Sequence, residues 1–151
     1  MPTRIYSNEL KIEHYLGRWF AIAYFPTWFQ KGCKHVTATY TMKEGYIQVE
    51  NSCTNGNKRQ KIVGKAFFTD IPNLLDVQFF WPFKADYLIE YVSYAEEGEH
   101  KRYEYAIVGN QNKTYLWILA RHKLVPKPVL KQLLDFAKFK GYDVKRLVIE
   151  E

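Results

Sequence analysis

Eight short runs of alternating apolar and polar residues fill most of residues 17–121, and a turn signal ends nearly every run. Successive side chains of a β-strand point to opposite faces of the sheet, so this alternation predicts strands with one apolar face. The predicted strands cover residues 18–26, 34–42, 46–53, 58–69, 74–80, 86–94, 102–109 and 114–121. Their short connections are typical of an antiparallel meander. The pattern therefore predicts an all-β fold, an eight-stranded up-and-down antiparallel β-barrel.

The pattern changes period after the last predicted strand. Apolar residues recur at helical spacing over residues 128–140, with Pro128 in the first turn and Gly141 after the last. Residues 143–149 then return to a short strand. One amphipathic helix after eight strands can cover the outside of a barrel with its apolar stripe. We expect one C-terminal α-helix packed outside the barrel, followed by a short final strand.

Two distant residues are expected to meet at one end of this barrel. Gly17 and Trp19 open the first predicted strand, and Arg121 closes the last. Connections of an up-and-down meander alternate between its two ends, so the start of the first strand and the end of the eighth lie at the same end. A guanidinium binds favourably over an indole face. We predict that Trp19 and Arg121 close this end, with Gly17 beside them.

The opposite end collects aromatic and basic residues on its connections. The predicted portal residues are Trp28, Phe29, Lys31, Lys58, Trp81, Phe83 and Lys84, with Lys34, Arg59 and Lys113 close by. Such a rim suits a mouth that admits an apolar molecule with an anionic head, and it equally suits a surface that touches a membrane. A third interpretation is that Trp28 and Phe29 fold back as a lid over the interior.

The amino-acid composition limits the classes of molecule that the protein is expected to bind. The formal net charge of +6 favours anionic partners, namely fatty-acid carboxylates, phospholipid headgroups, an anionic membrane surface or nucleic acid. The charge is scattered along the chain, so a solvated basic surface explains it equally well. Aromatic residues make up 17% of the chain, and aromatic walls suit apolar ligands.

The sequence contains no recognisable motif for catalysis, phosphate binding or metal binding. Glycine-rich phosphate motifs and catalytic Ser–His–Asp motifs are absent. His14, His100 and His122 lie in separate regions, and their spacing indicates no metal site. We therefore predict no catalytic residue, no metal, no cofactor and no nucleic-acid partner.

The two cysteines fall at the open end of the predicted barrel. Cys33 lies at the end of the first connection and Cys53 at the end of the third strand, roughly across one hairpin. We predict a disulfide between them in an oxidising compartment, and two reduced thiols otherwise.

The sequence does not decide the cellular location of the protein. No stretch of about eighteen apolar residues is present, so we expect no membrane-spanning helix. Residues 1–9 are polar and lack an apolar signal core. Either the protein is cytoplasmic, or this chain begins after a removed signal.

Five stretches in order resemble the lipocalins, and within them the bacterial lipocalin group, which is close to apolipoprotein D and the plant temperature-induced lipocalins. The matching stretches are residues 15–23, 36–40, 105–109, 115–121 and 141–145. Phe20-Ala21 stands where the family usually has Tyr-Glu, and Tyr103-Glu104-Tyr105 replaces its usual Thr-Asp-Tyr. The resemblance covers nearly the whole chain, so we interpret residues 1–151 as one domain: an N-terminal segment (1–16), the barrel (17–121), and the helix with the final strand (122–151).

The resemblance implies a non-enzymatic protein that binds, stores or transports a small hydrophobic ligand, with a fatty acid or a lysophospholipid expected for this branch. The wall residues expected to face the ligand follow from polarity and from the family register. They are Val36, Ala38, Tyr40, Ile47, Val49, Ile62, Gly64, Ala66, Phe68, Val77, Phe79, Tyr87, Ile89, Tyr91, Ala106, Val108, Tyr115 and Trp117. Gly64 and the alanines are expected to leave space for the ligand.

Three alternatives stay open beside the carrier. The protein can be a peripheral envelope or membrane-maintenance protein that docks on anionic lipid through its rim. A few lipocalins are isomerases with a pocket cysteine, and His35 lies two residues from Cys33. The barrel can also be filled by its own aromatic side chains. Bacterial relatives are often envelope lipoproteins anchored through an N-terminal cysteine, which this chain does not show, so the periplasm, the outer membrane and the cytoplasm all stay open.

Overall fold

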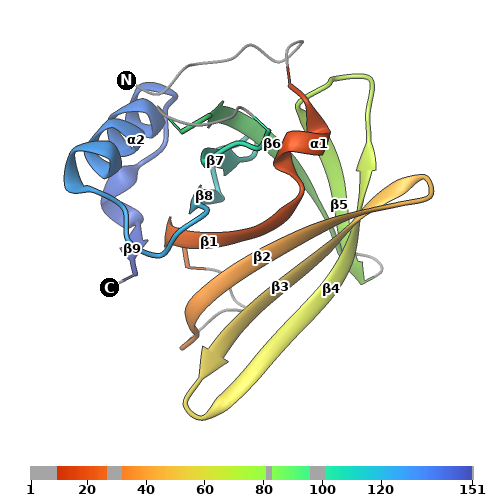
Figure 1. Cartoon of the computed structure of the whole chain (residues 1–151), viewed down its shortest axis with the longest axis horizontal. Coiled ribbons are helices and arrows are strands. Elements are labelled where there is room, and N and C mark those ends of the chain that lie inside the picture. The colour runs from red at the N-terminus through yellow and green to blue at the C-terminus, as the bar shows by residue number, and fades with distance from the viewer. Residues whose placement is uncertain (1–9, 27–31, 81–82, 96–100, 151) are drawn as a thin grey trace.

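The computed structural model describes residues 10–26, 32–80, 83–95 and 101–150, which form a barrel with one longer helix beside it (Figure 1). The strands are β1 (Gly17–Tyr24), β2 (Lys34–Lys43), β3 (Tyr46–Asn55), β4 (Lys58–Phe68), β5 (Leu74–Phe80), β6 (Phe83–Ser93), β7 (Tyr105–Gly109), β8 (Leu116–Ala120) and β9 (Val148–Ile149). The helices are α1 (Ile12–Tyr15), α2 (Lys127–Phe139) and a 3₁₀ turn, η3 (Val144–Arg146). No helix in the described ranges is both long and apolar enough to cross a membrane.

The eight strands β1 to β8 close into an antiparallel barrel, as predicted. Each strand pairs with the next along the chain, and β1 pairs with both β2 and β8. The ring closes where Trp19 lies opposite Ala38 of β2 and Phe20 lies opposite Ala120 of β8. Closure leaves the barrel strands without the long open edges that invite aggregation.

The strand β9 fills a seam between β1 and β2. Beyond Phe20, β1 turns from β2 to β9, and Tyr24 lies opposite Val148. The carboxylate of Glu150 then bridges the seam, because its Oε1 accepts hydrogen bonds from the Tyr24 hydroxyl at 3.1 Å and the Val36 backbone N–H at 3.4 Å. Burial first, and Glu150 next, raise the pKa of Tyr24 to about 12.

The buried side chains form two layers. One cluster lies inside the barrel and includes Trp19, Val49 and Ala106. The other lies between the outer face of the sheet and α2, where Leu133 and Ala137 of the helix meet Ile107 of β7. The helix therefore covers the outside of the barrel, as its apolar stripe predicts.

The C-terminal elements differ from the prediction in detail. The helix α2 begins one residue earlier than expected and ends before Gly141, whose φ of +101° suits glycine. The predicted strand over residues 143–149 is shortened to β9, because the Asp143 side chain accepts a hydrogen bond from the Lys145 N–H and the chain turns through η3 first. The short helix α1 was not predicted at all.

A bulge in β6 changes which residues face the interior. Ile89 lies opposite Val108 and Tyr91 lies opposite Ile107, so Glu90 is the additional residue between them. Beyond the bulge, the alternation of inward- and outward-facing side chains along β6 shifts by one residue. Tyr91 therefore packs outside the barrel, 4.9 Å from the ring of Phe136 on α2, and is not an interior wall residue.

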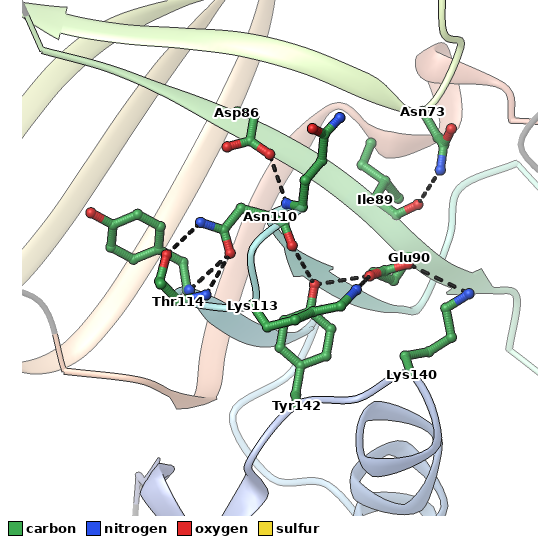
Figure 2. A network of polar contacts seen from close by, with 11 residues as sticks. Asn73, Asp86, Ile89, Glu90, Asn110, Lys113, Thr114, Lys140 and Tyr142 are labelled. Carbon is green, nitrogen blue, oxygen red and sulfur yellow. Dashed lines mark hydrogen bonds and ion pairs between the residues drawn. The ribbon is translucent and has the colours of Figure 1, made fainter.

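Glu90 itself organises the outer layer (Figure 2). Its side chain is 6% exposed and forms ion pairs with Lys113 at 3.1 Å and with Lys140 at 3.7 Å. The Tyr142 hydroxyl donates to Glu90 at 2.9 Å and also lies 3.2 Å from the Asn110 carbonyl oxygen. This cluster, Glu90 with Lys113, Lys140 and Tyr142, joins β6 and the β7–β8 connection to the end of α2, and is called the Glu90 clasp below.

Candidate functional site

The interior of the barrel is walled mainly by the side chains that the alternation predicts. The predicted wall residues that belong to the interior cluster or pack against it are Val36, Ala38, Tyr40, Ile47, Val49, Ala66, Val77, Phe79, Tyr87, Ile89, Ala106, Val108 and Trp117. The structure adds Tyr15, Tyr24, Leu75, Val92 and Leu119. Ile62 is half-buried, and Gly64 is buried.

Two other predicted wall residues lie at strand ends. Phe68 ends β4 and is 49% exposed, and Tyr115 precedes β8 and is 36% exposed. Alternation assigns both to the inner face, but a side chain at the end of a strand reaches solvent at the rim of the barrel. Neither residue belongs to the interior cluster.

Three wall residues remain incompletely buried although they face inward. Phe79, Tyr87 and Trp117 pack against the interior cluster and are half-buried. Trp117 stacks on Tyr24, with ring centroids 5.9 Å apart. These three side chains therefore keep some accessible surface beside the interior cluster.

The space beside Gly64 is occupied. A Cβ added there would lie 2.7 Å from Cδ1 of Phe79 and 2.8 Å from the carbonyl oxygen of Gln78. The expectation that Gly64 leaves room for a ligand is therefore wrong, because β5 takes that space. A groove of about 410 Å³ does open here, but Tyr46, Lys65 and Gln78 in its lining alternate with inward-facing residues, so it lies on the outer face of β3, β4 and β5.

The closed end is sealed by Trp19 and Arg121, as predicted. The guanidinium carbon lies 3.7 Å from the centroid of the Trp19 ring, and the two residues are 0% and 4% exposed. The indole N–H of Trp19 donates to the carbonyl oxygen of Tyr15 at 2.8 Å. The backbone turns into β1 at Gly17 with a φ of +100°, where a Cβ would meet Nη1 of Arg121 at 3.4 Å.

Arg121 also holds the short helix α1 in place. Its guanidinium donates to the carbonyl oxygens of Arg18 at 2.8 Å and Tyr103 at 2.8 Å. It donates further to the carbonyl oxygens at the end of α1, those of His14, Tyr15 and Leu16. These carbonyls have no partner within the helix, so the cation caps its C-terminus. Burial of the guanidinium lowers its pKa to about 10.

Three tyrosines meet inside the barrel above this seal. Tyr15 of α1, Tyr40 of β2 and Tyr87 of β6 bring their hydroxyls together. The hydroxyls of Tyr40 and Tyr87 are 2.6 Å apart, and the Tyr15 hydroxyl also hydrogen-bonds that of Tyr87. Sequence reasoning missed Tyr15, since it precedes the first strand and no alternation places it, although it begins the first of the matching stretches.

Because the pKa values of these three tyrosines are raised in the folded protein, we expect the protein to lose stability at alkaline pH. Burial raises the pKa of Tyr40 from 10.0 to about 12, and it raises the pKa values of Tyr15 and Tyr87 as well. The unfolded chain therefore releases these protons first, so their stabilisation is complete below about pH 10 and is lost as the pH rises toward 12. Urea denaturation at about pH 9 and about pH 11 should show the fall, and Tyr40→Phe should reduce it. An identical fall in Tyr40→Phe would contradict this assignment.

The open end carries the disulfide. Cys33 and Cys53 are bonded, with their Cα atoms 5.5 Å apart and 20 residues between them in sequence. A loop of this length stabilises the fold by about 3 kcal/mol in the chain-entropy model. The bond fixes the entry into β2 against β3 beside the mouth.

The predicted rim is described only in part. Trp28, Phe29, Lys31 and Trp81 lie outside the described residues, and the side chains of Phe83 and Lys84 are likewise not described. Lys58, Lys34 and Arg59 are exposed. Lys113 is not a free rim cation, because it pairs with Glu90 and lies 4.6 Å from the centroid of the Tyr142 ring. The described ranges contain no group of histidine, cysteine and carboxylate side chains that would hold a metal ion.

Comparison with known proteins assigns the family. Residues 10–151 match the model of the lipocalin-like domain. Outer membrane lipoprotein Blc of Citrobacter freundii is 34% identical over 146 residues, which cover 93% of this chain and 78% of that protein. Temperature-induced lipocalin-1 of Arabidopsis thaliana is 34% identical over 150 residues, which cover 91% of this chain and 77% of that protein.

A solved structure agrees on the architecture. Apocrustacyanin C1 has a TM-score of 0.70 at 19% sequence identity, over 93% of this chain and 78% of that one. At this identity the likeness concerns the fold alone. The barrel, the Trp19–Arg121 seal and the family match over residues 10–151 together show that the chain belongs to the lipocalins, in the group of the bacterial lipocalins.

Proposed function

We propose that this protein binds and carries a fatty acid or a lysophospholipid inside its barrel. The lipocalin barrel is an architecture that holds one small ligand, and small hydrophobic molecules are the class that family membership supports. The observation that carries the proposal is the apolar inner wall on which Phe79, Tyr87 and Trp117 stay half-buried. A ligand covering this surface gains about 0.8 kcal/mol for each buried methylene.

The two ends of the barrel support the direction in which such a ligand enters. The closed end is filled by α1, Trp19 and Arg121, which leaves the mouth beside the disulfide as the entrance. Exposed cations near the mouth, Lys34, Lys58 and Arg59, would attract an anionic carboxylate or phosphate. Because they are exposed, they would orient the headgroup and add little affinity.

The names of the relatives and the disulfide of this chain support a location and a non-enzymatic role. Three relatives of 31% to 34% identity carry the name outer membrane lipoprotein, which supports a cell-envelope location, in the periplasm or at the outer membrane. The disulfide agrees with an oxidising compartment. Both cysteines of the chain are bonded to each other, which argues for a non-enzymatic binding role and against a thiol-dependent isomerase.

A fluorescence titration tests the carrier function. Palmitic acid and a lysophosphatidylcholine, added in turn below their critical micelle concentrations, should change the tryptophan emission and saturate near one ligand per protein. In Trp117→Phe, most of the change should be lost because Trp117 lies on the inner wall. A flat titration in the parent protein would remove the proposal.

A vesicle-binding experiment distinguishes the carrier from the alternative, a protein that docks on membranes. Vesicles that contain anionic lipid should bind a docking protein through its exposed cations, with or without a ligand inside the barrel. If Lys58→Ala binds vesicles more weakly than the parent but binds palmitic acid equally well, the rim also contacts lipid. Vesicle binding by a parent protein that binds neither ligand would favour docking as the function.

A further inference from the structure

Three tyrosine hydroxyls meet at one place inside the barrel, in the tyrosine cluster formed by Tyr15, Tyr40 and Tyr87. The ring centroids of Tyr15 and Tyr40 are 5.1 Å apart, those of Tyr40 and Tyr87 are 5.9 Å apart, and those of Tyr15 and Tyr87 are 6.4 Å apart. Three separate elements supply them, so the fold and not local sequence brings the hydroxyls together.

The hydroxyls of this cluster have hydrogen-bonding capacity left over. Each tyrosine hydroxyl has one proton to donate and also accepts hydrogen bonds. Within the part of the chain that the structure describes, two hydrogen bonds join these hydroxyls, and both involve Tyr87. Each of the three hydroxyls has a partner within the cluster, and the Tyr15 and Tyr40 side chains also interact with each other. Their oxygens keep lone pairs that can accept a further hydrogen bond, so an incoming hydroxyl could donate to them.

The cluster lies where the inner end of a bound molecule would come to rest. Tyr40 pairs with Gly17 at the start of β1, and the Tyr15 ring centroid is 5.3 Å from that of Trp19 in the seal. Tyr15 and Tyr40 are almost fully buried, but Tyr87 is half-buried and keeps accessible surface. The aliphatic side chains of Val49 and Ala66 belong to the same interior cluster. A chain that enters from the mouth would therefore end at these hydroxyls.

The chemistry of the cluster selects an uncharged group. Burial keeps the hydroxyls protonated, since the pKa of Tyr40 is about 12 and those of Tyr15 and Tyr87 are also raised. The nearby cation Arg121 is directed to backbone carbonyls of α1, β1 and Tyr103. A carboxylate buried here would lack a paired charge, which is costly, whereas a hydroxyl needs only hydrogen bonds.

We propose that the tyrosine cluster is a binding subsite for an uncharged hydroxyl group at the inner end of the ligand. This inference rests on the proposed carrier function and makes it more specific. The ligand is then a molecule with two polar ends, an anionic head at the mouth and a hydroxyl group at the end of its hydrocarbon chain. Tyr87, the hydroxyl shared by both hydrogen bonds, is the residue that contacts this group.

The test compares ω-hydroxypalmitic acid with palmitic acid, and ω-hydroxylauric acid with lauric acid, so that two chain lengths are covered. The measured quantity is the ratio of the dissociation constants of the plain acid and the ω-hydroxy acid. In the parent protein this ratio should be about tenfold higher than in Tyr87→Phe, because the variant loses the hydrogen bond and leaves the ligand hydroxyl unpaired. Comparing this ratio between the parent and the variant cancels the lower hydrophobicity of the ω-hydroxy chain, which is the same for both proteins.

Tyr142→Phe is the matched control, since it makes the same chemical change outside the barrel and should keep the parent ratio. If Tyr87→Phe fails to fold, Tyr40→Phe takes its place and should show the same loss. Equal ratios in the parent and the cluster variants at both chain lengths would overturn the subsite and leave the carrier function standing. Binding of none of the four acids would overturn both.

Discussion

Replacing Arg121 with methionine should lower the free energy of unfolding by about 3–5 kcal/mol, the largest effect expected for a single side chain here. Methionine fills a similar length but donates no hydrogen bond. The carbonyl oxygens of Leu16 and Tyr103 would then lose their donor, and that of His14 would keep only the Tyr103 N–H. The contact with the Trp19 ring would lose its charge as well. Urea denaturation followed by far-ultraviolet circular dichroism measures the loss.

A second arginine provides the control. The guanidinium carbon of Arg146 lies 4.7 Å from the centroid of the Phe25 ring, but Arg146 is exposed on η3. Arg146→Met should cost less than about 1 kcal/mol, since an exposed cation–π contact is weak. Equal losses in the two variants would mean that the seal owes nothing to the carbonyls that Arg121 binds.

Replacing Glu90 with alanine should lower the free energy of unfolding by about 3 kcal/mol. The Glu90 side chain is 6% exposed, and Figure 2 shows its carboxylate in contact with Lys113, Lys140 and Tyr142. Its removal leaves the Lys113 ammonium and the Tyr142 hydroxyl without their main partner, and breaking a buried ion pair on one side costs more than the pair contributes. Hydrogen exchange should show the largest loss of protection in α2 and the segment after it.

The exposed pair on α2 is the matched control for Glu90. Lys131 and Asp135 lie one helical turn apart with their charged atoms 2.9 Å apart. Because both side chains are in water, Asp135→Ala should change the free energy of unfolding by only about 0.5 kcal/mol. A loss in Glu90→Ala no larger than this would show that the Glu90 clasp does not hold the helix on the barrel.

The barrel could be predicted because its determinants are local and repeated. Alternating runs and short turns define eight strands, and the counting of ends brings Trp19 and Arg121 together without knowledge of any distance. The disulfide follows from the same counting, since both cysteines fall at the open end. The helix α2 is equally evident, because its apolar spacing persists over several turns.

The errors arise where one residue changes the geometry of a strand. The bulge at Glu90 turns Tyr91 outward, and no alternation rule announces an inserted residue. Gly64 is read from sequence as empty space, yet the packing of β5 against β4 fills it with the Phe79 ring. Both features depend on the partner strand, which a single strand's sequence does not contain.

The tyrosine cluster shows a different limit. Tyr40 and Tyr87 could be assigned to the wall from their strands, but Tyr15 comes from α1, a helix too short to have a periodic pattern. The position of α1 depends on the guanidinium of Arg121, more than a hundred residues away. A hydrogen-bonded group assembled from three such elements becomes visible only in three dimensions.

The bridge made by Glu150 places a constraint on the folding of the protein. Its carboxylate joins β1 to β2 across the seam, and β9 pairs with the half of β1 that β2 leaves free. These residues follow all eight barrel strands in the sequence. A barrel on which β9 has not yet docked exposes the unpaired half of β1, so that intermediate is the state in which a chaperone would be most needed.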